Sequence, residues 1–245
     1  MLKLKTIIMK TTKITLLLLV LLTATSCMFD GFGIQGNRNV VSEDRKINSD
    51  FEAIKVSEGI TVFLTQSDDI EMRVEADENI IDLLVTEVEG DVLKIYFDKN
   101  VSRAKARNVY LSASKINIIK TSSGAEVRSD GVIKSKNIIL KSSSGSEINV
   151  TVETLSVTAS TSSGSEIEVS GFTESFTGNA SSGSEIDASD LIAKNGNVGV
   201  SSGAGIDVHV TDELTARASS GGNISYEGNP NLNKSKSSGG SISKH

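Results

Sequence analysis

The amino-acid sequence predicts an all-β protein: a right-handed parallel β-solenoid (β-helix) with coils of about 18–21 residues and a β-rich N-terminal part. A Ser-Ser-Gly motif recurs in the second half of the chain, and the segments between copies alternate β-branched with polar residues. The chain has one proline, as expected where nearly every backbone N–H is paired. The motif glycines, which lie 21, 19, 19, 20, 18 and 18 residues apart, are Gly124, Gly145, Gly164, Gly183, Gly203, Gly221 and Gly239.

Residues 1–27 are predicted to be a lipoprotein signal peptide. Four lysines precede an apolar run over residues 14–22, which is too short to cross a membrane as a helix. Ala24-Thr25-Ser26-Cys27 resembles a bacterial lipobox, so we expect Cys27 to be lipidated and to hold the protein at a membrane. Cys27 is the only cysteine, which excludes an intramolecular disulfide. The alternative is an ordinary signal peptide cleaved near Ser26, and translation can start at Met1 or Met9.

Residues 28–39 are rich in glycine and asparagine and are predicted to be a flexible tether. Removal of the signal peptide, with its four lysines, leaves 21 basic and 31 acidic groups, a net charge of −10. Because an acidic chain repels nucleic acid and anionic lipid, neither is an expected partner.

Residues 40–118 are expected to form strands joined by short turns. Glu89-Gly90-Asp91, between Val88 and Leu93, predicts a hairpin, and residues 79–84 predict one helical turn. Residues 119–245 form the repetitive solenoid part. There each glycine is expected to make a left-handed corner, next to which small serines stack in ladders. Leucine-rich repeats have a similar period, but their Leu-x-x-Leu-x-Leu frame is missing.

The chain resembles the bacterial family described as "putative auto-transporter adhesin, head GIN domain" from about Asn37 to the C-terminus. The resemblance rests on Thr86–Ile95, on the Ser-Gly-Ser copies and on Gly222–Pro230. It implies a β-helix-like fold, a cell-envelope location in Gram-negative bacteria and no catalytic residues. The opening pattern is carried by Gly36, Val40, Arg45, Phe51, Ile54, Val56, Gly59, Val62, Leu64 and Gln66.

Acidic residues recur at two positions of the repeat and are predicted to stack as ladders one strand apart. Such carboxylates either splay into solvent, acquire raised pKa values, or share Ca²⁺, which accepts carboxylate oxygens in loose geometry. The frame of calcium β-rolls is absent, so a solvated acidic face is the main expectation and a calcium ladder the alternative. No other cofactor is expected. The residues are Glu126, Glu147, Glu166 and Glu185 at one position, and Glu168, Asp187 and Asp207 at the other.

No enzyme is predicted. The acids repeat rather than form a unique pair, and His209 lies in an alternating strand. We therefore expect a non-enzymatic, lipid-anchored adhesin of the outer membrane that presents a repetitive acidic Ser/Gly-rich surface to a protein or glycan. The alternatives are a periplasmic structural or assembly protein without external ligand, and a β-helix carbohydrate-active enzyme. The side of the membrane is left open, and self-association through the C-terminal coil is a further expectation because a solenoid end exposes strand edges.

Overall fold

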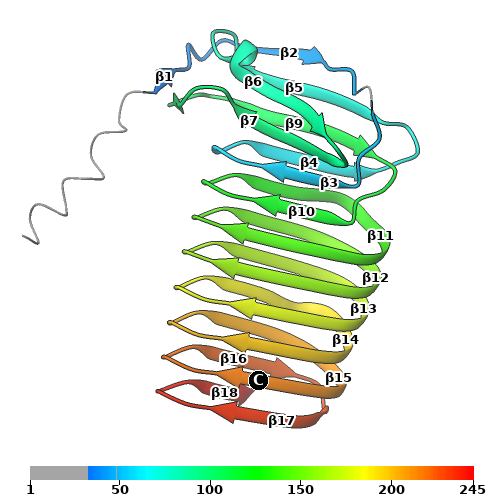
Figure 1. Cartoon of the computed structure of the whole chain (residues 1–245), viewed down its shortest axis with the longest axis vertical. Coiled ribbons are helices and arrows are strands. Elements are labelled where there is room, and N and C mark those ends of the chain that lie inside the picture. Colours follow the sequence, from blue (N-terminus) through cyan, green and yellow to red (C-terminus); the bar gives the residue numbers. More distant parts are fainter. Residues whose placement is uncertain (1–32, 48) are drawn as a thin grey trace, which may run out of the picture.

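The computed structural model describes residues 33–47 and 49–245. The predicted signal peptide with Cys27 and the first part of the predicted tether, residues 28–32, lie outside these residues. About 67% of the protein is β-strand, wound into a β-solenoid of about 7 turns, as the sequence predicts. Figure 1 shows the coils stacked along the long axis, with the first strands at one end and the C-terminus at the other.

Each regular coil crosses the solenoid, bends and returns, so that its two halves belong to two facing sheets. Five long strands contain both halves: β11 (Glu126–Ser143), β12 (Glu147–Ser162), β13 (Glu166–Ala180), β14 (Glu185–Val200) and β15 (Gly205–Ala218). The first sheet holds their first halves together with β2 (Val40–Asp44), β4 (Thr61–Gln66), β5 (Glu71–Asp77), β9 (Arg107–Ala113), β16 (Asn223–Glu227) and β18 (Ser241–Lys244). The second sheet holds their second halves together with β3 (Ala53–Val56), β6 (Leu84–Glu89), β7 (Val92–Phe97), β10 (Ile118–Thr121) and β17 (Asn231–Lys236).

The core lies between the two sheets and consists of stacked apolar side chains. Alternation along each strand buries every second residue, as in β12, where Ile148, Val150 and Val152 are buried. The bulky Phe176 is accommodated because Gly178, its second neighbour along the strand, has no side chain. A Cβ atom at Gly178 would lie 2.9 Å from the Phe176 ring. One buried row in register comprises Val127, Ile148, Ile167, Ile186, Ile206, Ile224 and Ile242.

The Ser-Ser-Gly motifs form the corners along one edge of the solenoid, on the left in Figure 1. At each corner the second serine and the glycine both have positive φ, for example 57° at Ser163 and 67° at Gly164. Two successive left-handed residues form the tight turn that suits right-twisted strands. The glycine N–H donates to the second serine's carbonyl in the next corner, as from Gly164 to Ser182 (3.2 Å). The corners therefore carry a hydrogen-bond ladder of their own.

An eighth corner precedes the repeats. Glu58 and Gly59 have φ values of 64° and 68°, and the Gly59 N–H donates to the Ser123 carbonyl at 3.0 Å. The Ser-Ser-Gly motif does not predict this corner, because Glu58 replaces the second serine. The solenoid therefore starts within residues 40–118, and both sheets continue without interruption across residue 118.

The first coils do not follow one another in chain order. β3 lies between β7 and β10, and β4 lies between β9 and β11. β3 and β4, which come first along the chain, therefore belong to the second coil in space. The chain then forms the cap and returns as β7 and β9, which make up the end coil. It continues as β10, which pairs with the other side of β3. This exchange distinguishes the N-terminal part from the repeats.

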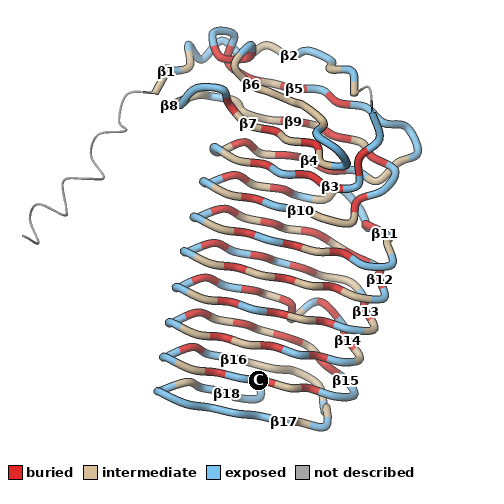
Figure 2. The backbone as a smooth tube through the Cα atoms, viewed as in Figure 1, coloured by how far each residue is buried: buried red, intermediate tan, exposed pale blue. Residues whose placement is uncertain are grey.

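The two ends of the solenoid differ. At the N-terminal end β2 pairs with β5, β5 with β9 and β6 with β7, all in antiparallel fashion. The β6–β7 pair is the predicted hairpin, and the predicted helical turn is the 3₁₀ turn η1 (Ile81–Leu83). β1 (Ile34–Gln35) pairs with β8 (Val101–Ser102), so residues 33–39 belong to this cap and not to a tether. At the C-terminal end β17 and β18 are bare edges, and β17 is exposed along nearly its whole length (Figure 2).

Candidate functional site

The predicted acidic residues lie on the outer side of the first sheet and are brought together as expected. Glu126, Glu147, Glu166 and Glu185 are in direct register on four neighbouring strands. Glu168, Asp187 and Asp207 form a second row two residues further along the strands. We call these seven residues the acidic rows. Adjacent members are one strand spacing apart, about 4.8 Å at the backbone.

Burial and mutual repulsion both raise pKa values within the acidic rows. Partial burial raises the pKa of Glu166, and the carboxylates of Glu147 and Glu185 raise it further. Burial likewise raises the pKa of Asp207, with Asp187 adding to the effect. Arg128 relieves the repulsion at one end, because its guanidinium pairs with Glu126 and lies 3.8 Å from Glu147. Among the described residues, no Lys or Arg forms an ion pair with Glu166 or Glu185.

The acidic rows do not converge on a point. Within the described residues, no group of three or more His, Cys, Asp or Glu side chains is arranged to hold a metal ion. Some carboxylates have partners from the protein, as where Asn149 donates to Glu168 and where the Ser189 N–H and hydroxyl donate to Asp187. The face has the geometry of a flat acidic surface, and the calcium ladder stays a prediction.

The opposite face carries a row of lysines that the sequence analysis did not find. Lys94, Lys55, Lys120 and Lys141 are in register on β7, β3, β10 and β11, on the outer side of the second sheet. We call them the lysine row. Lys94 forms an ion pair with Glu89. The other three side chains are exposed, and no carboxylate in the described part of the chain lies within ion-pair distance of them.

A shallow hollow of about 300 Å³ lies along the lysine row. Its wall includes Lys55, Lys120 and Lys141 together with Ser122 and Ser143, the first serines of two corners. Those serines stand two residues from the lysines and so lie on the same outer side of the sheet. The hollow therefore offers ammonium groups and hydroxyls, and its lining contains no acid. The outer side of the first sheet is therefore acidic and part of the outer side of the second sheet is basic, although the net charge of the protein is negative.

A larger cleft of about 690 Å³ lies between the cap and the outer side of the first sheet. Phe63 and Tyr110 stack there with ring centroids 5.1 Å apart, and the Arg73 guanidinium lies 4.4 Å from the Tyr110 ring centre. Because β9 runs between β4 and β5, both faces of the Tyr110 ring are covered. A sugar therefore cannot stack on Tyr110, and we assign the stack to packing of the exchanged coils.

The described residues that line the cleft do not form a catalytic constellation. The carboxyl residues in its lining, Asp44, Glu71 and Asp130, come from separate segments, and Asp44 is in register with Arg73. His209 is half-buried on β15, and its Nδ1 lies 3.9 Å from a Glu227 carboxylate oxygen. Neither feature places a nucleophile beside a base.

The comparisons with known proteins give the chain its family. The family model described as "Putative auto-transporter adhesin, head GIN domain" matches residues 50–230. The chain belongs to this family. Among curated proteins no relative matches. Within the described residues no helix is long and apolar enough to span a membrane.

Solved structures show the same fold at low identity to this adhesin-family chain. A "putative adhesin" from Bacteroides fragilis is 18% identical with a TM-score of 0.80, covering 87% of this chain and 100% of that one. A "putative adhesin" from Parabacteroides distasonis is 20% identical with a TM-score of 0.72, covering 86% and 99%. A "putative lipid binding protein" from the same species is 24% identical with a TM-score of 0.68, also covering 86% and 99%.

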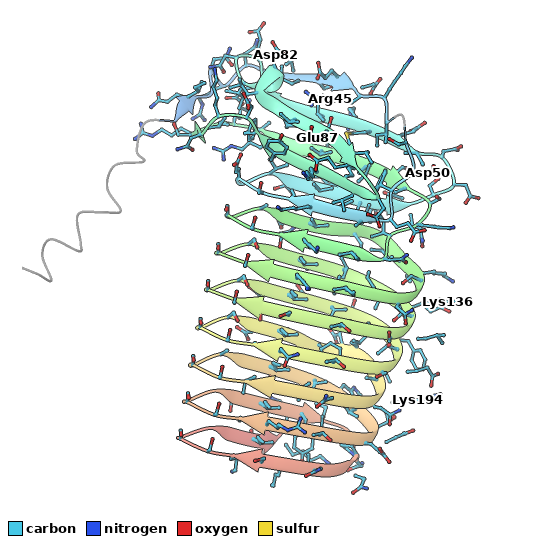
Figure 3. All side chains as sticks on the ribbon, in the orientation of Figure 1. Arg45, Asp50, Asp82, Glu87, Lys136 and Lys194 are labelled. Carbon is cyan, nitrogen blue, oxygen red and sulfur yellow. The ribbon has the colours of Figure 1, made fainter. Side chains whose placement is uncertain are left out.

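Several residues of the family pattern prove to be structural. Gly36 packs against the Asp77 carboxylate so closely that a Cβ atom would lie 2.1 Å from it. Arg45, labelled in the cap in Figure 3, donates to the carbonyls of Leu84 and Ile81. Gln66 bridges β4 to β11 by bonding the Lys134 backbone through both ends of its amide. The pattern thus specifies the cap and the exchanged coils, not a binding site.

Proposed function

We propose that this chain is a non-enzymatic adhesin held on the outer membrane of a Gram-negative bacterium by lipid on Cys27. The observation that carries the proposal is a rigid solenoid of the adhesin family with two flat, exposed faces of repeated polar side chains. A repeated surface suits a repeated ligand, such as a glycan or an ordered protein array, better than one small substrate.

The order of the chain gives the proposed anchor a direction. β1 begins seven residues after Cys27 and belongs to the cap. A lipid on Cys27 would therefore hold the cap near the membrane and direct the C-terminal coil away from it. Both charged faces would then stand along the membrane normal, accessible from the side.

Two experiments test the proposal. Metabolic labelling with a palmitate analogue should mark the protein, and Cys27→Ala should abolish the label. Protease added to intact cells should digest the protein while a periplasmic marker survives, with susceptibility of the purified protein checked in parallel because solenoids resist proteases. Protection on intact cells would contradict an adhesin role and favour a structural or assembly role in the periplasm. Glycan hydrolysis by purified protein would favour the enzyme alternative instead.

A further inference from the structure

We propose that the lysine row binds an acidic polysaccharide, one that bears a carboxylate on successive sugar residues, laid along the solenoid axis. The proposal rests on the proposed function only in taking the ligand to be external. It names the face of contact and the ligand class, neither of which follows from the adhesin family.

First, the lysine row carries positive charges that no ion pair in the described part of the chain neutralises. Lys55, Lys120 and Lys141 point outward from adjacent strands, and within the described residues none has an ion-pair partner. Three like charges about one strand spacing apart repel one another, so a chain of anions would relieve a repulsion that the protein itself leaves in place. The mature chain as a whole is acidic, and Glu87 and Glu89 line a hollow with Lys55 and Lys94 at one end of the row. The positive charge without a neighbouring acid is therefore centred on Lys120 and Lys141, where an anion can approach.

The second argument is spacing. The row repeats once per strand, about 4.8 Å along the axis. This spacing is comparable with the length of one pyranose residue in an extended glycan. Successive carboxylates of a uronic-acid polymer point to different sides of its chain, so about every second or third carboxylate would face the row and lie within reach of one or two ammonium groups. Lysine side chains are long and flexible, so small mismatches are absorbed by their rotamers.

The third argument separates glycans from other polyanions. Beside the lysines runs a row of corner serines, including Ser122, Ser143 and Ser162, whose hydroxyls suit a ligand rich in hydroxyls. The hollow has no aromatic side chain in its lining. Tyr96, in the adjoining hollow, donates its hydroxyl to Glu87, whose carboxylate repels a phosphate backbone, so base stacking is disfavoured on this face.

The test uses the full chain in detergent and titrates it with polygalacturonate, with neutral dextran and single-stranded DNA as comparison polymers. We expect binding of polygalacturonate that weakens with added salt, and none of dextran. The variant K55Q/K120Q/K141Q should weaken binding by about tenfold or more, since several exposed ion pairs are lost. The matched control K99Q/K136Q/K115Q removes the same charge from exposed lysines outside the row and should change binding less than about twofold.

Lys136 lies on the edge opposite the corners (Figure 3), away from the lysine row. Equal melting temperatures of the two triple variants would show that both fold. If the row variant does not fold, Lys120→Gln alone should still weaken binding by about threefold.

Each contrary outcome is decisive. Unchanged affinity in the row variants, or equal losses in row and control variants, would overturn the assignment of the face. Binding of single-stranded DNA as tight as that of polygalacturonate would overturn the ligand class. If the row variants bind polygalacturonate as the wild type does, but protease still digests the protein on intact cells, the adhesin proposal stands. Binding in vitro together with protection on cells would overturn the adhesin proposal alone.

Discussion

Glycines with positive φ are needed for different physical reasons, and substitution by alanine distinguishes those reasons. At the corner glycine Gly164 (φ 67°) a Cβ atom would meet nothing within 4 Å, whereas at Gly171 (φ 107°) it would lie 2.1 Å from the Val152 carbonyl oxygen. We expect Gly164→Ala to cost about 1 kcal/mol of unfolding free energy, through backbone strain alone. Gly171→Ala should cost about 3 kcal/mol or more, because strain and overlap add. Urea denaturation measures both, and equal losses would contradict the distinction.

Asp77 is the residue on which the cap depends most. Its buried carboxylate accepts N–H bonds from Arg38 (2.7 Å), Lys105 (2.9 Å) and Ala106 (3.1 Å). Burial by itself raises the pKa of Asp77, but these three donors outweigh it and hold the pKa below its usual range. Asp77→Ala leaves three backbone donors without their acceptor and should destabilise the protein by about 3 kcal/mol.

The lowered pKa also fixes the direction of the pH dependence. Because the folded protein holds Asp77 charged more readily than the unfolded chain, this stabilisation is present above the unfolded value of about 3.9 and is lost as pH falls through the lowered folded pKa. Asp77→Asn should remove that part of the acid sensitivity. Wild-type and variant melting curves that converge toward acid pH would agree with this, whereas a constant difference at every pH would contradict it.

At the scale of the strand rows, the acidic rows cost stability at neutral pH. The pKa of Glu166 is raised in the folded protein, so folding is weakened above the folded pKa, and the loss is recovered as pH falls through that value. Glu166→Gln should therefore stabilise the protein at pH 7 by a few tenths of a kcal/mol, since the side chain is exposed to screening solvent. The gain should shrink at acid pH and in high salt. Glu153→Gln, which breaks the pair with Lys134, is a control without this pattern.

The last coil contains a device against the self-association expected from sequence. Lys234 and Lys236 on β17 are in register with buried Ala216 and Ala218, so lysines occupy positions that are apolar in the coil before. Charged residues at inward positions discourage pairing at an open strand edge. We expect the wild type to be monomeric and Lys234→Val/Lys236→Val to form end-to-end oligomers, as measured by sedimentation velocity. Oligomers of the wild type through this end would contradict this prediction and support self-association through the C-terminal coil.

At the scale of the whole molecule, local stability should follow the order of the coils in space. β3 and β4 each pair on both sides, whereas β17 and β18 each have one partner. Amide exchange through local opening should therefore be slow in β3 and β4 and fast at the C-terminal end, although β4 lies near the start of the described chain. Exchange measured by mass spectrometry on the full chain gives the comparison. Equal rates in β4 and β17 would contradict it.

The sequence predicted what repeats and missed what depends on chain order. The period located the corners, and equal phase located the acidic rows. Lys120 and Lys141 stand four residues before their corner glycines, as does Lys55 before Gly59, so the same phase test could have found three members of the lysine row. It did not, because the corner at Gly59 was not included among the repeats. Lys94 and the Phe63–Tyr110 stack depend on the exchange of the first coils, which no local pattern encodes.

The exchanged coils also constrain how the chain can be made. Ile54 pairs with Leu93 on one side and with Ile119 on the other, so its strand is complete only when segments 39 and 65 positions later have arrived. A polypeptide that emerges N-terminus first, from a ribosome or a translocation pore, therefore holds an apolar segment without partners while those residues are still to come. Once residue 121 has emerged, every later coil can add to the one before it. Biogenesis of this protein should accordingly show one slow, chaperone-sensitive stage followed by rapid growth from a finished template.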